Sequence, residues 1–483
     1  MDIETLKGLR KELDLYLDRF ADCIKTAPSR DLASIYVRGQ LSNLERKTLA
    51  AIALDAGIPP RTLQELLEIH RWSEAKVRDR VQTIIRDDHA DPDALGVIDE
   101  TGCPKKGAMT AGVQPQYCGA LGKVGNCVVT VHLGYVAKGF HALLDGDLYV
   151  PEAWFKDRAR CRKAGIPKTV VYRTKCQIAV DLLAYAVAQG VPLRYLTADE
   201  NYGRCATFRH EVADLGLTYV VEVPCSLTGW TRRPVVVEPS ETRGPRAARG
   251  GKGRPARRAR LAPGAPRPRR LDAIYKRRSH AWETFYIKDT EKGPVVWEAR
   301  AVRFFPREKT LPGPELWLLV ARNVLDGEVK YFFSNAPKET PLEVLLTIAF
   351  GRAHVEQLIE ESKGEVGLDH FEVRGYRPIR RHLMLSMVSL LFLEEQTRRL
   401  QDAEKKSVVE PLPGPRSGRG PTRARLGPPG ADTSVVQRAP QDPVLAGDQR
   451  TRRPLPLCAA LPSTRETRHQ TGPPQEMRFF VAL

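Results

Sequence analysis

The sequence has no Cys-x-x-C pair and no apolar run long enough to span a membrane. Its nine cysteines are scattered over 483 residues, so their spacing argues against a zinc ribbon and their odd number against a disulfide framework. The N-terminal residues MDIETLKGLRKELDLYL mix charged and apolar side chains, which excludes the apolar core of a signal peptide. These absences predict a cytoplasmic protein with reduced thiols and no membrane partner.

Acidic residues are in the minority. The chain has 76 Lys and Arg against 58 Asp and Glu, which gives a formal net charge of +18. This surplus favours polyanionic partners, because each phosphate that a cation neutralises releases a condensed counterion. Ribosomal, membrane-surface and heparin-type partners would be attracted by the same charge. The balance therefore indicates a class of partner and no chemistry.

Residues 1–90 carry apolar residues at helical spacing and predict an all-helical N-terminal domain. Within it, we expect one helix from about Asn43 to Ala56 and a second from about Pro60 to His70, separated by the residues Gly-Ile-Pro-Pro. Two short helices joined by a Gly-containing turn are compatible with a DNA-binding helix-turn-helix. A plain helical hairpin that packs or dimerises is equally compatible, and the sequence leaves both open.

From Leu95 the pattern changes to β-strands, in LGVID, NCVVTVHLGYV and GFHALLDGDLYV. A helix over 175–190 and a strand over 193–199 follow, which is an α/β pattern with room for a parallel strand pair. We therefore predict an α/β domain over residues 91–400. It includes a β-rich block of about 217–340, with antiparallel strands over 284–334, and a helical stretch over 341–399 with a break near 364–378.

Two segments have the composition of loops. Between Arg243 and Arg278 fourteen basic residues face a single acid, Asp272, which predicts a flexible basic loop over 239–280. A solvated linker and a contact with DNA backbone are both compatible with it. Residues 401–483 are rich in Pro and Arg, without an apolar period, and we expect a disordered tail. One hypothesis is that this tail is an out-of-frame translation.

Three acids have positions of chemical interest. Asp99 ends the apolar run LGVI, Asp199 ends the run YLTA, and Glu356 lies on the predicted helix GRAHVEQLIEESKGE. If the two strands are neighbours, both aspartates emerge at one edge of the sheet. Such a trio of carboxylates can hold two Mg²⁺ ions, or Mn²⁺ in their place, for phosphodiester chemistry. Taken singly, each acid is as compatible with a turn or a solvated helix face, and Glu100, Glu200, Glu360 and Glu361 are rivals for the same roles.

Five ordered stretches resemble a known family. IDETGCPKKG, QYCGALGKVGNC, LYVPEAW, TADENYG and ESKGEVGLDHFEVR, spread over roughly residues 95–395, are similar to the DDE insertion-sequence transposases that carry a Tyr-Arg-Glu-Lys signature. The resemblance implies an RNase H-like catalytic core with a β-strand insertion. It makes Asp99, Asp199 and Glu356 the catalytic acids and metal ligands. The signature spacing also matches Arg352 and Lys363, whereas its Tyr position holds Ala349.

The resemblance implies metal-dependent DNA cleavage at the element's ends and strand transfer into a target, with double-stranded DNA as partner and a homodimer as the working unit. Arg352 and Lys363 would contact phosphates, and Lys105 and Lys106 either do the same or lie in a solvated loop. One of the tryptophans of the β-rich block could stack on a flipped base, although core packing suits most of them. The alternatives are an inactive or repurposed DNA-binding relative, and a nuclease that cuts without joining.

Overall fold

The computed structural model describes residues 3–239, 258–276, 281–290, 293–408 and 437–438. The principal helices are α1 (Ile3–Asp18), α2 (Ala27–Gln40), α3 (Leu49–Asp55), α4 (Pro60–Glu68), α5 (Glu74–Asp88), α6 (Glu152–Lys156), α7 (Arg158–Lys163), α8 (Lys175–Ala188), α9 (Glu200–Gly203), α10 (Ala206–Asp214), α12 (Leu271–Tyr275), α13 (Leu342–Phe350), α14 (Ala353–Gly364) and α15 (Tyr376–Val408). The principal strands are β1 (Leu95–Pro104), β2 (Gln114–Cys118), β3 (Lys123–Ala137), β4 (Phe140–Tyr149), β5 (Tyr195–Ala198), β6 (Thr218–Glu222), β7 (Thr228–Trp230), β11 (Glu283–Thr290), β12 (Gly293–Glu308), β14 (Leu316–Asn323) and β15 (Val329–Ser334).

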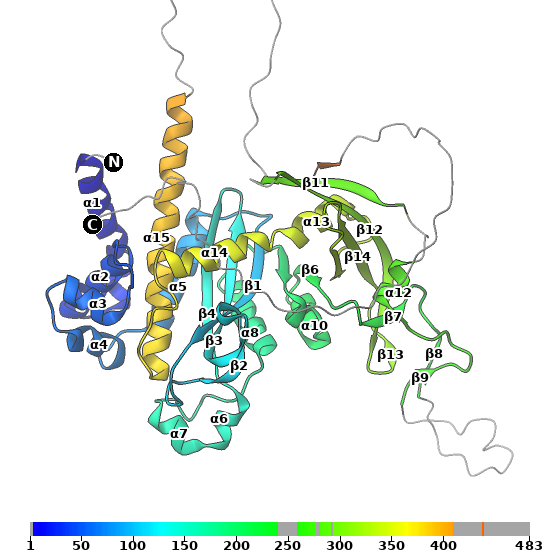
Figure 1. Cartoon of the computed structure of the whole chain (residues 1–483), viewed down its shortest axis with the longest axis horizontal. Helices are drawn as coiled ribbons and strands as arrows, with labels where there is room; N and C mark the ends of the chain where they lie inside the picture. The colour runs from blue at the N-terminus through cyan, green and yellow to red at the C-terminus, as the bar shows by residue number, and fades with distance from the viewer. Residues whose placement is uncertain (1–2, 240–257, 277–280, 291–292, 409–436, 439–483) are drawn as a thin grey trace, which may run out of the picture.

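A mixed sheet forms the centre of the molecule (Figure 1). Its core order is β4-β3-β1-β5-β6, in which β1, β5 and β6 are parallel and the β3–β4 hairpin is antiparallel to β1. Three strands of one direction beside an antiparallel hairpin is the arrangement of an RNase H-like core. The predicted α/β fold class, with helices preceding it, is confirmed.

Helices cover both faces of this core. On one face, α14 crosses the strands so closely that a methyl group on Gly134 of β3 would lie 3.2 Å from Leu358 and 3.3 Å from Val355. On the other face lies α8, whose Lys175 binds Glu100 of β1 at 2.6 Å. Because side chains alternate along a strand, neighbouring residues of β1 point to different helices.

The N-terminal helices are joined to the core through α15, which packs against α2, α4, α5 and β4 together. Buried polar contacts fix this junction: Tyr36 of α2 binds His382 at 2.8 Å, and Gln40 binds Ser386 at 2.7 Å. α3 and α4 form the expected pair of helices around a turn at Gly57, which has φ +68°. That positive φ suits glycine, which has no Cβ to clash. Whether the pair reads DNA stays a prediction.

The β-rich block extends the core sheet. β15 pairs with β6, and β14, β12 and β11 follow as antiparallel neighbours, as predicted for 284–334. The expected flexible loop over 239–280 differs from the structure in residues 258–276, which contain the short strands β9 (Arg260–Leu261) and β10 (Arg269–Arg270) and helix α12. Leu271 is fully buried there, and Trp230 donates its indole N–H to the Pro266 carbonyl at 2.7 Å. The burial of Leu271 and the hydrogen bond from Trp230 therefore fix a segment whose composition is that of a linker.

The break in the helical stretch lies between α14 and α15, close to where it was predicted. Most of the predicted tail, residues 409–436 and 439–483, lies outside the described residues, and so do 240–257 of the basic loop. Among the described helices, none combines the length and apolar character that crossing a bilayer requires.

Candidate catalytic site

Asp99 and Asp199 lie on adjacent parallel strands at matching positions. β1 and β5 pair as far as Ile98 and Ala198, and the two aspartates are the residues that follow this pair along the chain. β5 ends there, and the Asp199 carboxylate caps α9 by accepting from the N–H groups of Asn201 and Tyr202. Asp99, by contrast, does not end its strand. β1 continues to Pro104 because the long strand β3 goes on pairing with it, so only the parallel pairing stops at Asp99.

Both aspartates point to the face of the sheet that α14 covers. Asp99 has the same alternation as Val97, whose neighbour on β3 is Gly134, the residue under α14. Asp199 has the same alternation as Thr197, which pairs with Val97. In parallel strands paired residues share a face, so the two carboxylates lie side by side beneath this helix. β1 and β5 are therefore neighbours, which is the condition under which the sequence placed both aspartates at one edge of the sheet.

Glu356 and Arg352 lie at the start of α14. Arg352 occupies the N-cap position, Glu356 is in the first turn, and the two form an ion pair at 3.4 Å. The Glu356 side chain is 61% exposed, so its carboxylate is accessible to a ligand. Among the described residues, Arg352 is the ion-pair partner of Glu356, and no contact joins Glu356 to either aspartate. The structure thus brings the two aspartates together and places Glu356 on the covering helix, without a direct contact.

A fourth acid, Glu222, was not identified from the sequence. It is the last residue of β6 and lies opposite Asp199 in the continued register of β5 and β6. Arg352 binds it at 3.1 Å. The pattern that marks the aspartates, an apolar run that ends in an acid, also occurs in TYVVE and could have identified it. Its ion pair with Arg352 joins residues 130 positions apart, which no local pattern reveals.

The electrostatics of Asp99 indicate a need for positive charge. The pKa of Asp99 is raised to about 6: burial is the largest cause and the charges of Asp199 and Glu100 act in the same direction, whereas the Glu100 N–H and Arg352 oppose them. His132, opposite Asp99 on β3, supplies no charge, because complete burial lowers the pKa of its imidazole to about 3. Arg352 is thus the cation that acts on a buried carboxylate with a second acid beside it. Such an arrangement favours a bound cation over two bare carboxylates.

The rival acids are placed elsewhere. Glu100 points to the opposite face, where it binds Lys175 at 2.6 Å and Tyr202 at 3.4 Å. Glu200 and Glu360 are exposed. Glu361 points toward β4 and α15 and binds His141 at 2.8 Å. Among the described residues, Glu100 is the rival joined to an aspartate, because Tyr202 binds Glu100 through its hydroxyl and Asp199 through its backbone N–H.

The cations that the sequence suggested differ in availability. Lys363 lies in the last turn of α14, and among the described residues no carboxylate is within ion-pair distance of it. The Lys105 ammonium donates to the Phe371 carbonyl at 2.5 Å and lies 3.6 Å from the Phe371 ring centroid, which favours a structural role. Lys106 is exposed. Phosphate contacts by Arg352, Lys363, Lys105 and Lys106 stay predictions.

Ala349, which stands where the family signature has Tyr, and the four tryptophans of the β-rich block can be located in the structure. Ala349, at the Tyr position, is buried on α13, one residue from Phe350, whose ring packs 4.8 Å from Trp297. Trp297 and Trp230 are core residues, whereas Trp282 and Trp317 are partly exposed. Trp282 lies 4.4 Å from the Arg300 guanidinium. These positions do not assign a base contact to any tryptophan.

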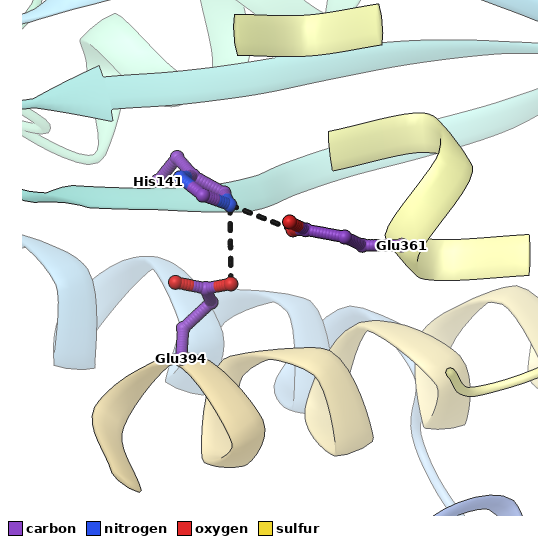
Figure 2. A group of neighbouring side chains, drawn as sticks. All are labelled: His141, Glu361 and Glu394. Atoms are coloured by element: carbon purple, nitrogen blue, oxygen red, sulfur yellow. Dashed lines mark hydrogen bonds and ion pairs between the residues drawn. The ribbon is translucent and has the colours of Figure 1, made fainter. Parts of the chain in front are cut away.

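A second charged cluster occupies the far half of α14. His141 of β4 lies between Glu361 of α14 and Glu394 of α15, at 2.8 Å and 3.1 Å from its Nε2 (Figure 2). Hydrogen bonds and charge from the two glutamates outweigh burial and raise the pKa of His141 to about 10. In this cluster the imidazole lies directly between its two carboxylates. At the aspartate edge, formed by Asp99 and Asp199, the cation Arg352 is paired instead with Glu222 and Glu356.

Comparison with known proteins places the chain in a family. The family model for DDE superfamily endonuclease matches residues 19–294, more than half of the chain, and this range contains Asp99 and Asp199 but not Glu356. The protein named probable transposase for insertion sequence element IS701, from Microchaete diplosiphon, is 32% identical over 188 residues, which is 38% of this chain. The match spans 46% of that relative's length. With the paired aspartates on an RNase H-like sheet, the family match shows that this chain belongs to the DDE superfamily endonucleases.

Proposed function

We propose that this protein is a transposase that cuts DNA at the ends of a mobile element and joins the freed 3′ ends to a target. The observation that carries the proposal is the matched position of Asp99 and Asp199 on adjacent parallel strands, beneath the helix that bears Glu356. Membership of the DDE superfamily endonucleases supports the nuclease part. The similarity to a probable insertion-sequence transposase supports the joining part.

Membership of this family implies the use of divalent metal ions, and the residues present fit them. The set offers carboxylate oxygens from Asp99, Asp199 and Glu356, which are the ligands that hard Mg²⁺ prefers. Burial and the neighbouring acids disfavour the charged form of Asp99 and raise its pKa, and a bound cation would stabilise that charged form. When bound, a pair of such ions activates the attacking oxygen and stabilises the leaving oxygen of an in-line displacement.

The chain's own residues would position the DNA for this reaction. Asp99 and Asp199 are fixed by the sheet and by the α9 cap, so their carboxylates keep their geometry when DNA binds. Arg352 and Lys363 flank Glu356 on α14, where they would contact phosphates on either side of the cut. The N-terminal helices would recognise the element's ends, and a dimer would hold two ends together. The net charge of +18 supports backbone affinity.

The test uses a supercoiled plasmid that carries the DNA flanking this gene on both sides, with Mg²⁺ or Mn²⁺. We expect cuts at defined positions in the flanks with the wild type and none with Asp199→Asn, which keeps the shape of the side chain. Loss should reach about 10³-fold or more, since several kcal/mol of charge stabilisation are removed at tenfold per 1.36 kcal/mol.

A second substrate separates cutting from joining. An oligonucleotide that ends in a pre-formed 3′-hydroxyl at the mapped cut should become attached to a target plasmid only if the protein transfers strands. Cutting without joining would indicate a nuclease. Specific binding to the flanks without cutting, equal in wild type and Asp199→Asn, would indicate an inactive DNA-binding relative and would overturn the proposal.

A further inference from the structure

The cluster of His141, Glu361 and Glu394 brings three possible metal ligands together from three separate elements. They come from β4, α14 and α15, and their side chains point toward one another (Figure 2). One ligand atom from each residue lies within 4.8 Å of the other two. The cluster is distinct from the aspartate edge, because Glu361 follows Glu356 by five residues and therefore points about 140° away from it around α14.

The charges of the cluster are out of balance. Two carboxylates share one imidazole, and among the described residues no Lys or Arg forms an ion pair with Glu361 or Glu394. Even with His141 protonated, the trio keeps a net charge of −1. One Nε2 proton must also serve two acceptors, at 2.8 Å and 3.1 Å. A divalent cation bound to neutral imidazole and two carboxylates would leave no net charge and contact all three atoms.

The two distances from His141 Nε2 to the glutamate oxygens are close to those between ligand atoms in a zinc site. Zinc takes imidazole nitrogen and carboxylate oxygen at about 2.0–2.2 Å in a tetrahedral arrangement, which separates ligand atoms by roughly 3.3 Å. The Nε2–oxygen separations here need to open by only a few tenths of an ångström. Gln357 also donates to the second oxygen of Glu361 at 2.7 Å, as partners of metal ligands commonly do. The three side chains are 13–28% exposed, so water can supply the fourth ligand.

We propose that His141, Glu361 and Glu394 bind one zinc-class divalent cation, at a site separate from the paired aspartates. The nitrogen ligand favours zinc over Mg²⁺, since imidazole suits later transition metals and Mg²⁺ prefers oxygen. The bound ion would join α14, which carries Glu356, to α15 and to β4.

The test measures zinc stoichiometry on the full-length protein after treatment with a chelator. Zn²⁺ is added against a chromophoric competitor, with excess Mg²⁺ to occupy the oxygen-rich aspartate edge. We expect one tight equivalent in the wild type and in Asp199→Asn, and its loss, with at least 100-fold weaker binding, in His141→Gln and in Glu394→Gln. Unchanged zinc binding in both cluster variants, or no tight zinc in the wild type, would overturn the proposal.

Two further measurements keep the result interpretable. Cysteines are alternative zinc ligands, so Co²⁺ is substituted and its spectrum recorded: oxygen and nitrogen ligands give tetrahedral d–d bands without a thiolate charge-transfer band. A thiolate band that persists in His141→Gln would assign the metal to cysteines and contradict the site. Circular dichroism confirms that each variant is folded, and Glu360→Gln, an exposed neighbour on α14, is the matched control that should retain zinc.

Discussion

The two ends of α14 carry acids in opposite circumstances. At its start, Glu356 is 61% exposed and lies on the helix that covers two aspartates, one of them with a raised pKa. In its second half, Glu361 is 28% exposed and is held by a histidine that is itself held by Glu394. The first group is short of positive charge and open to a ligand, whereas the second is partly neutralised within the protein. The difference supports our proposal that Glu356 acts in the reaction, whereas Glu361 attaches α14 to β4 and α15.

The most direct test of this difference removes the negative charge of Glu356 in one variant and of Glu361 in another. Glu356→Gln should reduce cleavage about 10³-fold, because it removes a charged ligand from the proposed metal site. Glu361→Gln should reduce cleavage less than tenfold and lower thermal stability instead. The two variants change the same group on the same helix, so each is the other's control. Equal losses of cleavage rate, measured on the flank plasmid, would mean that α14 does not separate the roles.

A pH titration sharpens the second half of the comparison. In chelator-treated protein the pKa of His141 is raised to about 10 from an ordinary value near 6.5, so its charged form stabilises the fold. This contribution, on the order of a few kcal/mol, is complete below pH 6.5 and is lost as the pH rises to about 10. The melting temperature of His141→Gln should therefore fall well below that of the wild type at pH 6 to 7.

The two melting curves should approach each other between pH 7 and 10. A difference that stays constant over that range would contradict a protonated histidine between the glutamates. Glu394→Gln is the second variant, and it tests whether the convergence comes from the titration of His141. It removes a partner that raises the pKa of His141, and the convergence should then begin at lower pH.

The smallest effect concerns the cations that flank Glu356. Arg352 is engaged with Glu222 and Glu356, whereas no acid among the described residues is paired with Lys363. Lys363→Ala should lower the slope of log affinity against log salt by roughly 0.9 if it contacts one phosphate. Lys163→Ala, an exposed lysine at the end of α7, is the matched control and should leave the slope unchanged. Equal slopes for all three proteins, in salt titrations of DNA binding, would remove Lys363 from the DNA contact.

Local sequence patterns predicted the parts that depend on neighbours in the chain. The runs that precede Asp99 and Asp199 are mostly apolar, because buried parallel strands carry apolar side chains on both faces. The α/β order of elements left room for the two strands to pair in parallel, and the structure shows that they do. The extension of β1 to Pro104 was not predicted, because a Gly-containing turn signal after Asp99 is outweighed by pairing with β3.

Contacts between distant residues were out of reach of those patterns. Arg352 meets Glu222 across 130 positions, and His141 meets Glu361 across 220. Each depends on how α14 crosses the sheet, which periodicity does not specify. The segment 258–276 differs from its prediction for a related reason: its composition is that of a linker, yet Leu271 is fully buried and its N–H donates to the distant Leu227 carbonyl at 3.0 Å.

The position of α15 has a consequence for synthesis of the chain. Tyr16 donates to the Val388 carbonyl at 2.9 Å, a contact that spans 372 positions, and Tyr36 reaches His382 across 346. The ribosome releases α1 and α2 long before it synthesises α15. The apolar side chains of these two helices that pack against α15 therefore stay solvent-exposed for most of translation. The slow step in folding should therefore be the docking of α15, and any truncation before residue 376 should leave the N-terminal helices prone to aggregate.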